Sequence, residues 1–161
     1  MVRFLKTNSG KKGEGMPVFR NPQFYFKEGF CWNLTLNEFS EYFKVRFKAK
    51  GVNDVNAMAL YPYDEKLAYY YVALLNSYFV FHYKRAFVSG NSAFQINDAR
   101  QLPIIIPSDE TLNKIERLVR KAINLASTSN TTEQEDGRLL ELENIREKLD
   151  YIICSLYKFQ R

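Results

Sequence analysis

The sequence contains few of the residues that form covalent or metal cross-links. Its 161 residues include two cysteines, Cys31 and Cys154, and one histidine, His82. Two distant thiols and one imidazole are too few for a disulfide framework or for a Cys/His metal site. The scarcity of cysteine favours a reducing compartment, so we expect a cytoplasmic protein.

Long apolar runs are also missing. No stretch approaches the roughly 18 apolar residues of a membrane helix, and residues 1–6 are too short and too charged for a secretory signal. We therefore expect no membrane partner. With 46% hydrophobic and 25% charged residues, the composition fits one globular domain, alone or with an appended helical element.

The charge is positive and unevenly distributed. There are 23 Lys and Arg against 18 Asp and Glu, a net charge of +5, and the isoelectric point is about 9.1. Residues 1–50 carry ten Lys and Arg against four Asp and Glu, whereas residues 51–108 and 109–161 are close to neutral. A positive first third favours a polyanionic partner such as nucleic acid.

The first two thirds of the chain, residues 1–108, have the pattern of a small α+β domain. Residues 1–15 predict a flexible basic lead, because residues 7–15 contain glycines and lysines and no apolar residue. Strands are predicted where short aromatic and β-branched runs occur, at residues 24–26, 30–36, 42–47 and 55–60. The alternation over residues 42–48 predicts a strand with Lys44, Arg46 and Lys48 on its outer face.

Helices are predicted for the rest of the chain. Residues 67–83 are apolar almost all round and predict one central buried helix, which Asp64 is placed to cap. Residues 102–107 predict a short extended segment between two prolines. Helical spacing then predicts two helices, from Asp109 and from Glu133. The predicted fold is α+β, a small mixed sheet with a central buried helix followed by a C-terminal helical hairpin over residues 109–161.

Candidate catalytic residues are sparse. The glycines at positions 10, 13 and 15 do not form a phosphate-binding loop, because no Gly-Lys-Ser/Thr follows them. Asp54, Asp64 and Lys66 have a spacing that metal-dependent nucleases also use, with two carboxylates on Mg²⁺ and a lysine beside the phosphate. This nuclease hypothesis competes with a simpler one, in which Asp64 only caps a helix.

Three ordered motifs point to a known family. They are FYFKEGFCW at residues 24–32, YYVALLNSYFVFHY at 70–83 and FQINDARQLPIIIP at 94–107. Over residues 18–125 the chain resembles the C-terminal target-recognition region of bacterial adenine-specific DNA methyltransferases. The resemblance is greatest to single-chain type IIG restriction-modification enzymes and the related phage-defence methylases.

The resemblance implies that catalysis lies on another part of the system. The methyltransferase domain of the family carries an Asn/Asp-Pro-Pro-Tyr/Phe motif, whereas the nearest string here, residues 21–24, has Gln23 in place of the second proline. We therefore expect a specificity domain without catalytic residues or a cofactor of its own. S-adenosylmethionine is expected on the absent methyltransferase domain, and duplex DNA and the methyltransferase or nuclease domain are the expected partners.

A reader of duplex DNA needs cations for phosphates and polar side chains for base edges. The candidate phosphate contacts are Lys11, Lys12, Arg46, Lys48, Lys50, Lys84 and Arg85. The candidate base-reading residues are Asn53, Asn56, Ser89, Asn91 and Ser92. In the third motif, Asn97 and Arg100 are expected to support the fold rather than to contact DNA.

A different class of function stays open. The Leu and Ile residues between Leu142 and Phe159 recur at steps of three and four, a spacing with which helices pack on one another. The chain would then be a protein-interaction module that docks through its C-terminal helices, and the basic face would be incidental. The same spacing also suits a helical hairpin within one chain.

Overall fold

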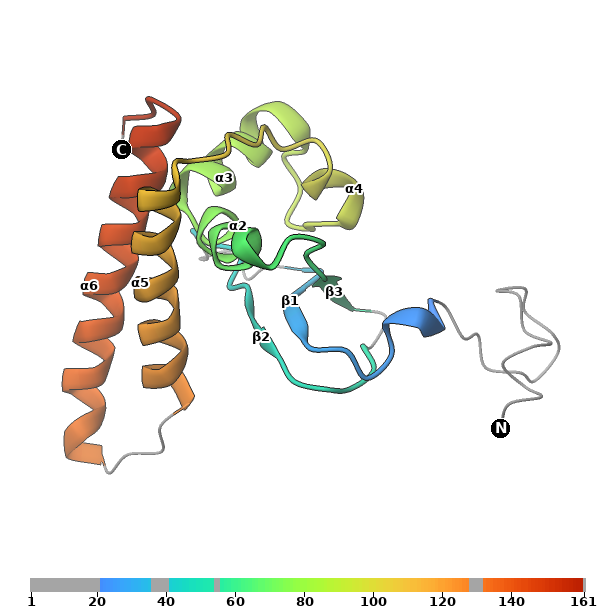
Figure 1. Ribbon diagram of the computed structural model, residues 1–161. Helices are drawn as coiled ribbons and strands as arrows, with labels where there is room; N and C mark the ends of the chain where they lie inside the picture. Colours follow the sequence, from blue (N-terminus) through green and yellow to red (C-terminus); the bar gives the residue numbers. More distant parts are fainter. Residues whose placement is uncertain (1–20, 36–40, 54–55, 128–131, 161) are drawn as a thin grey trace, which may run out of the picture.

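The computed structural model describes residues 21–35, 41–53, 56–127 and 132–160 (Figure 1). The predicted lead with Lys11 and Lys12 lies outside these residues, and so does Asp54. In the described part, a small sheet and a group of short helices are followed by two long helices that run side by side (Figure 1). The α+β class and the C-terminal helical hairpin are confirmed.

The sheet has three strands in the order β2-β1-β3. They are β1 (Gly29–Asn33), β2 (Arg46–Lys48) and β3 (Ala57–Leu60). Both ladders are antiparallel, so the mixed sheet predicted from the sequence is antiparallel instead. The strand predicted at residues 24–26 is wrong, because the chain forms a short 3-10 helix there, η1 (Pro22–Phe24), and then a turn.

The strand predicted over residues 42–48 is wrong in its first half. Lys44 has φ of 54°, which the extended chain of a strand does not allow, and only residues 46–48 pair with β1. Phe43 is drawn into the core, where its ring stacks on Phe94 at 3.8 Å. The alternation is lost as a result: Phe47 is 48% exposed, and Lys48 is 8% exposed.

The central helix is interrupted where one continuous helix was predicted. A 3-10 turn η2 (Glu65–Leu67), capped by Asp64 as expected, leads into α2 (Ala68–Leu75). The chain then breaks at Asn76 and Ser77 before α3 (Tyr78–Tyr83) and the π-helical turn η3 (Lys84–Val88). The break has a local cause, because the Ser77 hydroxyl accepts the Val80 N–H and starts a new helix.

The remaining elements cover the central helices. A short helix, α4 (Ile96–Ala99), precedes the extended residues 102–107. The hairpin consists of α5 (Asp109–Ser127) and α6 (Thr132–Leu156), which Lys121 and Glu141 join by an ion pair of 2.5 Å. Ser108 caps α5 as predicted, since its hydroxyl accepts the Thr111 N–H.

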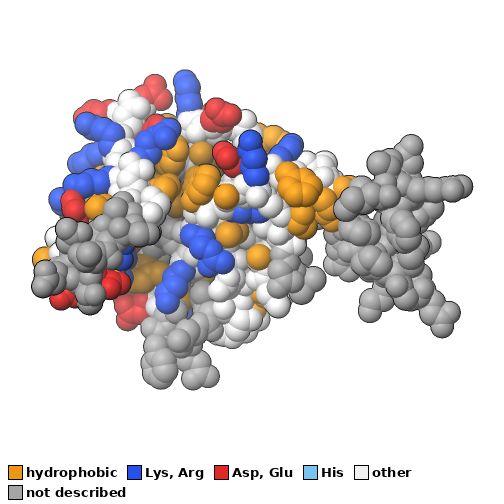
Figure 2. Space-filling view, turned by 90° about the horizontal axis from the view of Figure 1, so that it is seen from below, with side chains coloured by type: hydrophobic (Ala, Val, Ile, Leu, Met, Phe, Trp, Pro, Cys, Tyr) orange, Lys and Arg blue, Asp and Glu red, His pale blue; other side chains and the backbone are white. Residues whose placement is uncertain are grey.

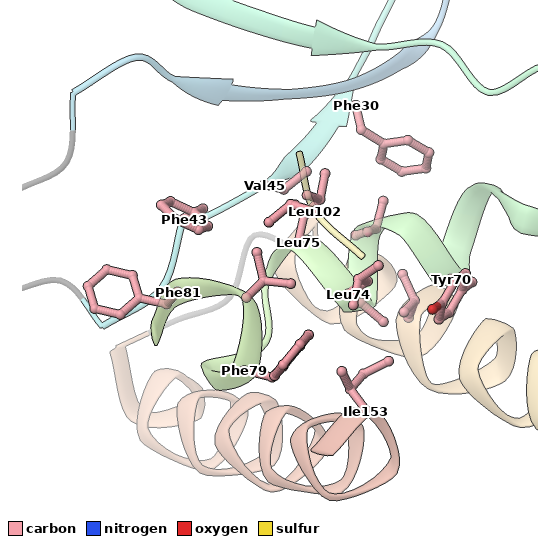
Figure 3. Close-up of a cluster of buried hydrophobic side chains, with 14 of the residues drawn as sticks. Phe30, Phe43, Val45, Tyr70, Leu74, Leu75, Phe79, Phe81, Leu102 and Ile153 are labelled. Carbon is pink, nitrogen blue, oxygen red and sulfur yellow. The ribbon is translucent and has the colours of Figure 1, made fainter. Parts of the chain in front are cut away.

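The core lies between the sheet and the hairpin, with α2 and α3 at its centre (Figure 3). Leu74 of α2 and Phe79 of α3 point toward Ile153 of α6, and Leu74 and Ile153 are fully buried. Each large apolar side chain removed from water in this way contributes about 1.5–3 kcal/mol. The prediction of a buried central helical segment is thus confirmed.

Candidate nucleic-acid interface

One end of the sheet collects exposed polar side chains from β1 and β2. Arg46 lies opposite Cys31 of β1, and it therefore shares a face of the sheet with Asn33, two residues further along. The Arg46 guanidinium donates to Asn33 Oδ1 over 3.3 Å, and both side chains are exposed. This pair orients the arginine and leaves its other donors for a ligand.

Two further segments are anchored at the same end of β1. The Leu34 N–H donates to the Asn56 carbonyl over 2.8 Å. Thr35 forms an antiparallel bridge with Ala93, and this bridge brings in the loop of residues 88–93. We call this region the polar end of the sheet. Its exposed side chains are Asn33, Thr35, Arg46, Asn56 and Ser92.

The five residues predicted to read bases differ in exposure and lie in different places. Asn56 and Ser92 belong to the polar end, and Asn91 is exposed on the same loop as Ser92. Asn53 and Ser89 are half-buried, and Asn53 lines a separate groove. Two of the five candidates therefore lie at the polar end, and a third, Asn91, lies on the loop that reaches it.

Lys48, a predicted phosphate contact, is used inside the fold. Its amine donates to the carbonyls of Lys27, Ala49 and Gly51 at 2.9, 3.2 and 3.0 Å. An ammonium has three hydrogens, so these three bonds use all of them. Lys48 thus joins the turn after β2 to the start of β1 and is a structural residue.

Lys84 is also used inside the fold. Its side chain is 1% exposed, and its amine donates to the carbonyl of Asn91 and to Asn91 Oδ1 at 2.6 and 3.0 Å. Burial lowers the pKa of this amine below its ordinary value; the nearby Asp98 opposes the shift and Arg85 adds to it. The other predicted phosphate contacts in the described chain, Arg46, Lys50 and Arg85, are exposed.

Several exposed residues near these cations were not singled out from the sequence. They include Asn33, Thr35 and the aromatic Phe87, which is 77% exposed in the turn that carries Arg85. The alternation of Cys31, Asn33 and Thr35 with apolar neighbours could have indicated that they share one face. On the face seen in Figure 2, side chains of both charge signs are mixed with exposed apolar ones.

Of the three candidate nuclease residues, Asp64 and Lys66 lie in the described chain. One carboxylate oxygen of Asp64 accepts the Lys66 N–H over 3.0 Å, as a helix cap does. Asp54 lies outside the described residues. Among the residues that are described, no group of three or more His, Cys, Asp or Glu side chains could hold a metal ion.

The third motif supports the fold, as expected for Asn97 and Arg100. Phe94 is fully buried and accepts the Trp32 indole N–H through its carbonyl at 2.9 Å. Asp98 accepts the Gln95 N–H, and Asn97 accepts from Arg100 at 3.1 Å. These bonds close the turns of α4 and fix the chain that returns toward β1.

A groove of about 920 Å³ lies beside β3, and Arg46 of the polar end does not line it. Its walls come from η1, β3, α2 and α4, and most of the lining side chains are apolar or aromatic. Among them are Phe24, Met58, Tyr61, Tyr71 and Ile96. Arg100 is the one charged residue in the lining that is described.

The helical seam of α6 is largely turned inward. Ile145 and Ile153 are buried, and Leu142, Leu149 and Ile152 are half-buried. The spacing that suggested a docking surface therefore builds the hairpin within this chain. The exposed apolar side chains of α6 are Leu139, Leu140 and Tyr151 in the described region.

Comparisons with known proteins add no family assignment. No protein-family model matches the chain, and no curated protein matches it. Among the helices that the structure describes, none has both the length and the apolar character that crossing a bilayer requires.

Proposed function

We propose that this chain recognises duplex DNA as the specificity domain of a restriction-modification adenine methyltransferase. The observation that carries the proposal is the polar end, where Asn33 holds Arg46 by a hydrogen bond and backbone contacts place Asn56 and the loop of residues 88–93 at the same end of β1. Amide and hydroxyl groups beside a guanidinium form the donor and acceptor set that base edges and phosphates require.

The cations of the described chain fall into two groups, and this supports the proposal. Arg46, Lys50 and Arg85 are exposed and can neutralise phosphates. Lys48 and Lys84 are buried and bind backbone carbonyls, Lys48 in the turn after β2 and Lys84 in the loop that carries Asn91. The resemblance of the three motifs to target-recognition regions is an independent support. On this proposal S-adenosylmethionine and methyl transfer belong to a methyltransferase domain outside this chain.

The test is a titration of labelled duplex pools across a series of salt concentrations. With two to four phosphates neutralised by the exposed cations, the plot of log affinity against log salt should have a slope of about −2 to −4. Arg46→Ala should weaken binding and make the slope shallower by about one. Lys148→Ala, which removes an exposed cation from α6, is the matched control and should bind like the wild type.

Equal affinity and equal slope for wild type and Arg46→Ala at low salt would contradict the proposal. That result would show that the polar end does not bind DNA, and it would favour the protein-interaction module. Such a module would use the exposed apolar side chains of α6, so the substitution of Leu139 and Leu140 would then be the next measurement.

A further inference from the structure

The loop of residues 89–92 is closed by one buried lysine. Lys84 stands at the start of η3, and its carbonyl accepts the Ser89 N–H over 2.7 Å. Its amine donates to the carbonyl and the side-chain oxygen of Asn91. Lys84 therefore binds the loop at Ser89, through its carbonyl, and at Asn91, through its amine. These contacts of one residue hold the shape of the loop.

The same contact fixes the orientation of the Asn91 amide. An ammonium can only donate, so the side-chain atom of Asn91 that faces Lys84 is the oxygen. The NH₂ group consequently points away from Lys84, and within the described chain no protein acceptor binds it. Asn91 is exposed, so this NH₂ group is available to a ligand.

Burial of a charged amine for this purpose has an energetic cost. The low pKa of Lys84 reflects the loss of water around the ammonium. A buried charge is tolerated when good hydrogen bonds compensate it, and here the compensating groups both belong to Asn91.

We propose that Lys84 and Asn91 form a clip that presents the Asn91 NH₂ group as a donor to a guanine edge in the major groove. The inference deepens the proposed DNA-binding function and rests on it. An asparagine that reads adenine turns both its NH₂ group and its oxygen toward the base, but here the Asn91 oxygen faces the buried Lys84 amine. The two hydrogens of the NH₂ group match the two acceptors of guanine, N7 and O6, whereas thymine offers the single acceptor O4 and adenine pairs its N7 acceptor with a donor. Lys84 is then a positioning residue that acts through Asn91.

The test compares base preferences in a duplex pool with a randomised core, sequenced before and after selection by the protein. Asn91→Ala should lose the preference for guanine at one position by about 5-fold to 150-fold. Preferences at the other positions and the salt slope should stay as in the wild type. Asn144→Ala, an exposed asparagine on α6, is the matched control and should change neither.

Lys84→Met tests the positioning role. The variant should weaken the preference for guanine at the same position of the site. The salt slope should stay unchanged, because the ammonium of Lys84 is buried and does not contact a phosphate. In the double variant the loss should equal that of Asn91→Ala alone, since the two residues act as one unit. If Lys84→Met does not fold, Asn91→Ala decides whether the Asn91 side chain reads a base, because in that variant the carbonyl of residue 91 still accepts from the buried Lys84 amine.

The outcomes separate this inference from the proposed function. A wild type that selects sequences, with Asn91→Ala selecting the same bases, overturns the clip and leaves DNA recognition intact. If Asn91→Ala instead binds all sequences equally more weakly, the Asn91 NH₂ group donates to a phosphate and the assignment to guanine is overturned. A wild type with no salt-dependent affinity for duplex overturns the proposed function itself.

Discussion

Three buried charged side chains act as cross-links between separate segments of the chain. Lys48 joins the turn after β2 to Lys27, two residues before β1, and Lys84 joins η3 to the loop that follows it. Asp150 of α6 accepts the Tyr42 hydroxyl at 3.2 Å and the Tyr78 N–H at 2.8 Å. Removing one partner of such a contact leaves a desolvated polar group, so these residues specify which segments meet.

A pair of tyrosines plays a similar role beside the extended segment. The Tyr70 hydroxyl donates to the Ile105 carbonyl at 2.5 Å, and the Tyr157 hydroxyl donates to the Pro103 carbonyl at 2.8 Å. Tyr70 is 1% exposed. Burial, reinforced by the hydrogen bond to Tyr157, raises the pKa of Tyr70 well above its usual value of about 10.

This shift predicts a loss of stability in alkali. Above pH 10 the unfolded chain releases the Tyr70 proton while the folded chain keeps it, so the unfolded state binds fewer protons. The free energy of unfolding should therefore fall as pH rises past 10, by at most about 1.4 kcal/mol per pH unit from this group. Below pH 10 the group should contribute no pH dependence.

Urea unfolding at pH 8 and pH 11 measures this effect. In Tyr70→Phe the difference between the two pH values should be smaller than in the wild type. Tyr151→Phe, which changes a side chain that is 77% exposed, should retain the wild-type difference. An unchanged difference in Tyr70→Phe would rule out this tyrosine as the source.

At the scale of elements, the junction between α2 and α3 organises the neighbouring chain. Asn76 stands in the helix break and uses both ends of its amide on one residue. Its oxygen accepts the Val45 N–H at 2.7 Å, and its nitrogen donates to the Val45 carbonyl at 2.9 Å. The side chain thus pairs with the backbone as a neighbouring strand would, directly before Arg46 enters β2.

Asn76→Ala should therefore lower both stability and affinity for DNA. Loss of the two hydrogen bonds leaves the peptide groups of buried Val45 unpaired, which should reduce the free energy of unfolding by about 1–3 kcal/mol. Urea unfolding gives this number, and the duplex titration gives the second effect, because Arg46 is no longer held in register. Asn144→Ala should change neither quantity.

For the whole molecule, the arrangement separates the polar end of the sheet from the helical hairpin (Figure 1). α5 and α6 lie together on one side of the central helices, and the sheet lies on the other (Figure 1). Lys121 and Glu141, with the buried Ile115 and Ile145, hold the hairpin together. On the proposed function, this hairpin is the segment that would link the chain to a methyltransferase or nuclease domain.

This organisation predicts that the isolated chain neither methylates nor cleaves DNA. Asp64 is engaged as a cap, and the string nearest to the catalytic motif of the resembled family, residues 21–24, has Gln23 in place of the second proline. Incubation with duplex, Mg²⁺ and S-adenosylmethionine, followed by assays for methyl incorporation and strand breaks, measures both activities. Mg²⁺-dependent cleavage that disappears in Asp64→Ala would bring the nuclease hypothesis back.

Local patterns in the sequence were sufficient for the helical hairpin and the fold class. The spacing of Leu142, Ile145 and Leu149 defines a helix face by itself, because a helix is built from contacts three and four residues apart. Ser108 and Asp64 were recognisable as caps for the same reason, since a cap acts on the next few residues. The central apolar run likewise predicted burial without reference to its neighbours.

The tertiary structure alone decided which cations stay exposed and where the polar end of the sheet forms. Lys48 looked like a member of a basic strand face, yet the carbonyl of Lys27, 21 residues earlier, binds its amine. Trp32 and Phe94 are 62 residues apart, and their hydrogen bond helps to bring the 88–93 loop to β1. Whether a side chain is buried, and which group it hydrogen-bonds, depends on segments that meet only in the folded chain. The sequence pattern gives no distance between such segments.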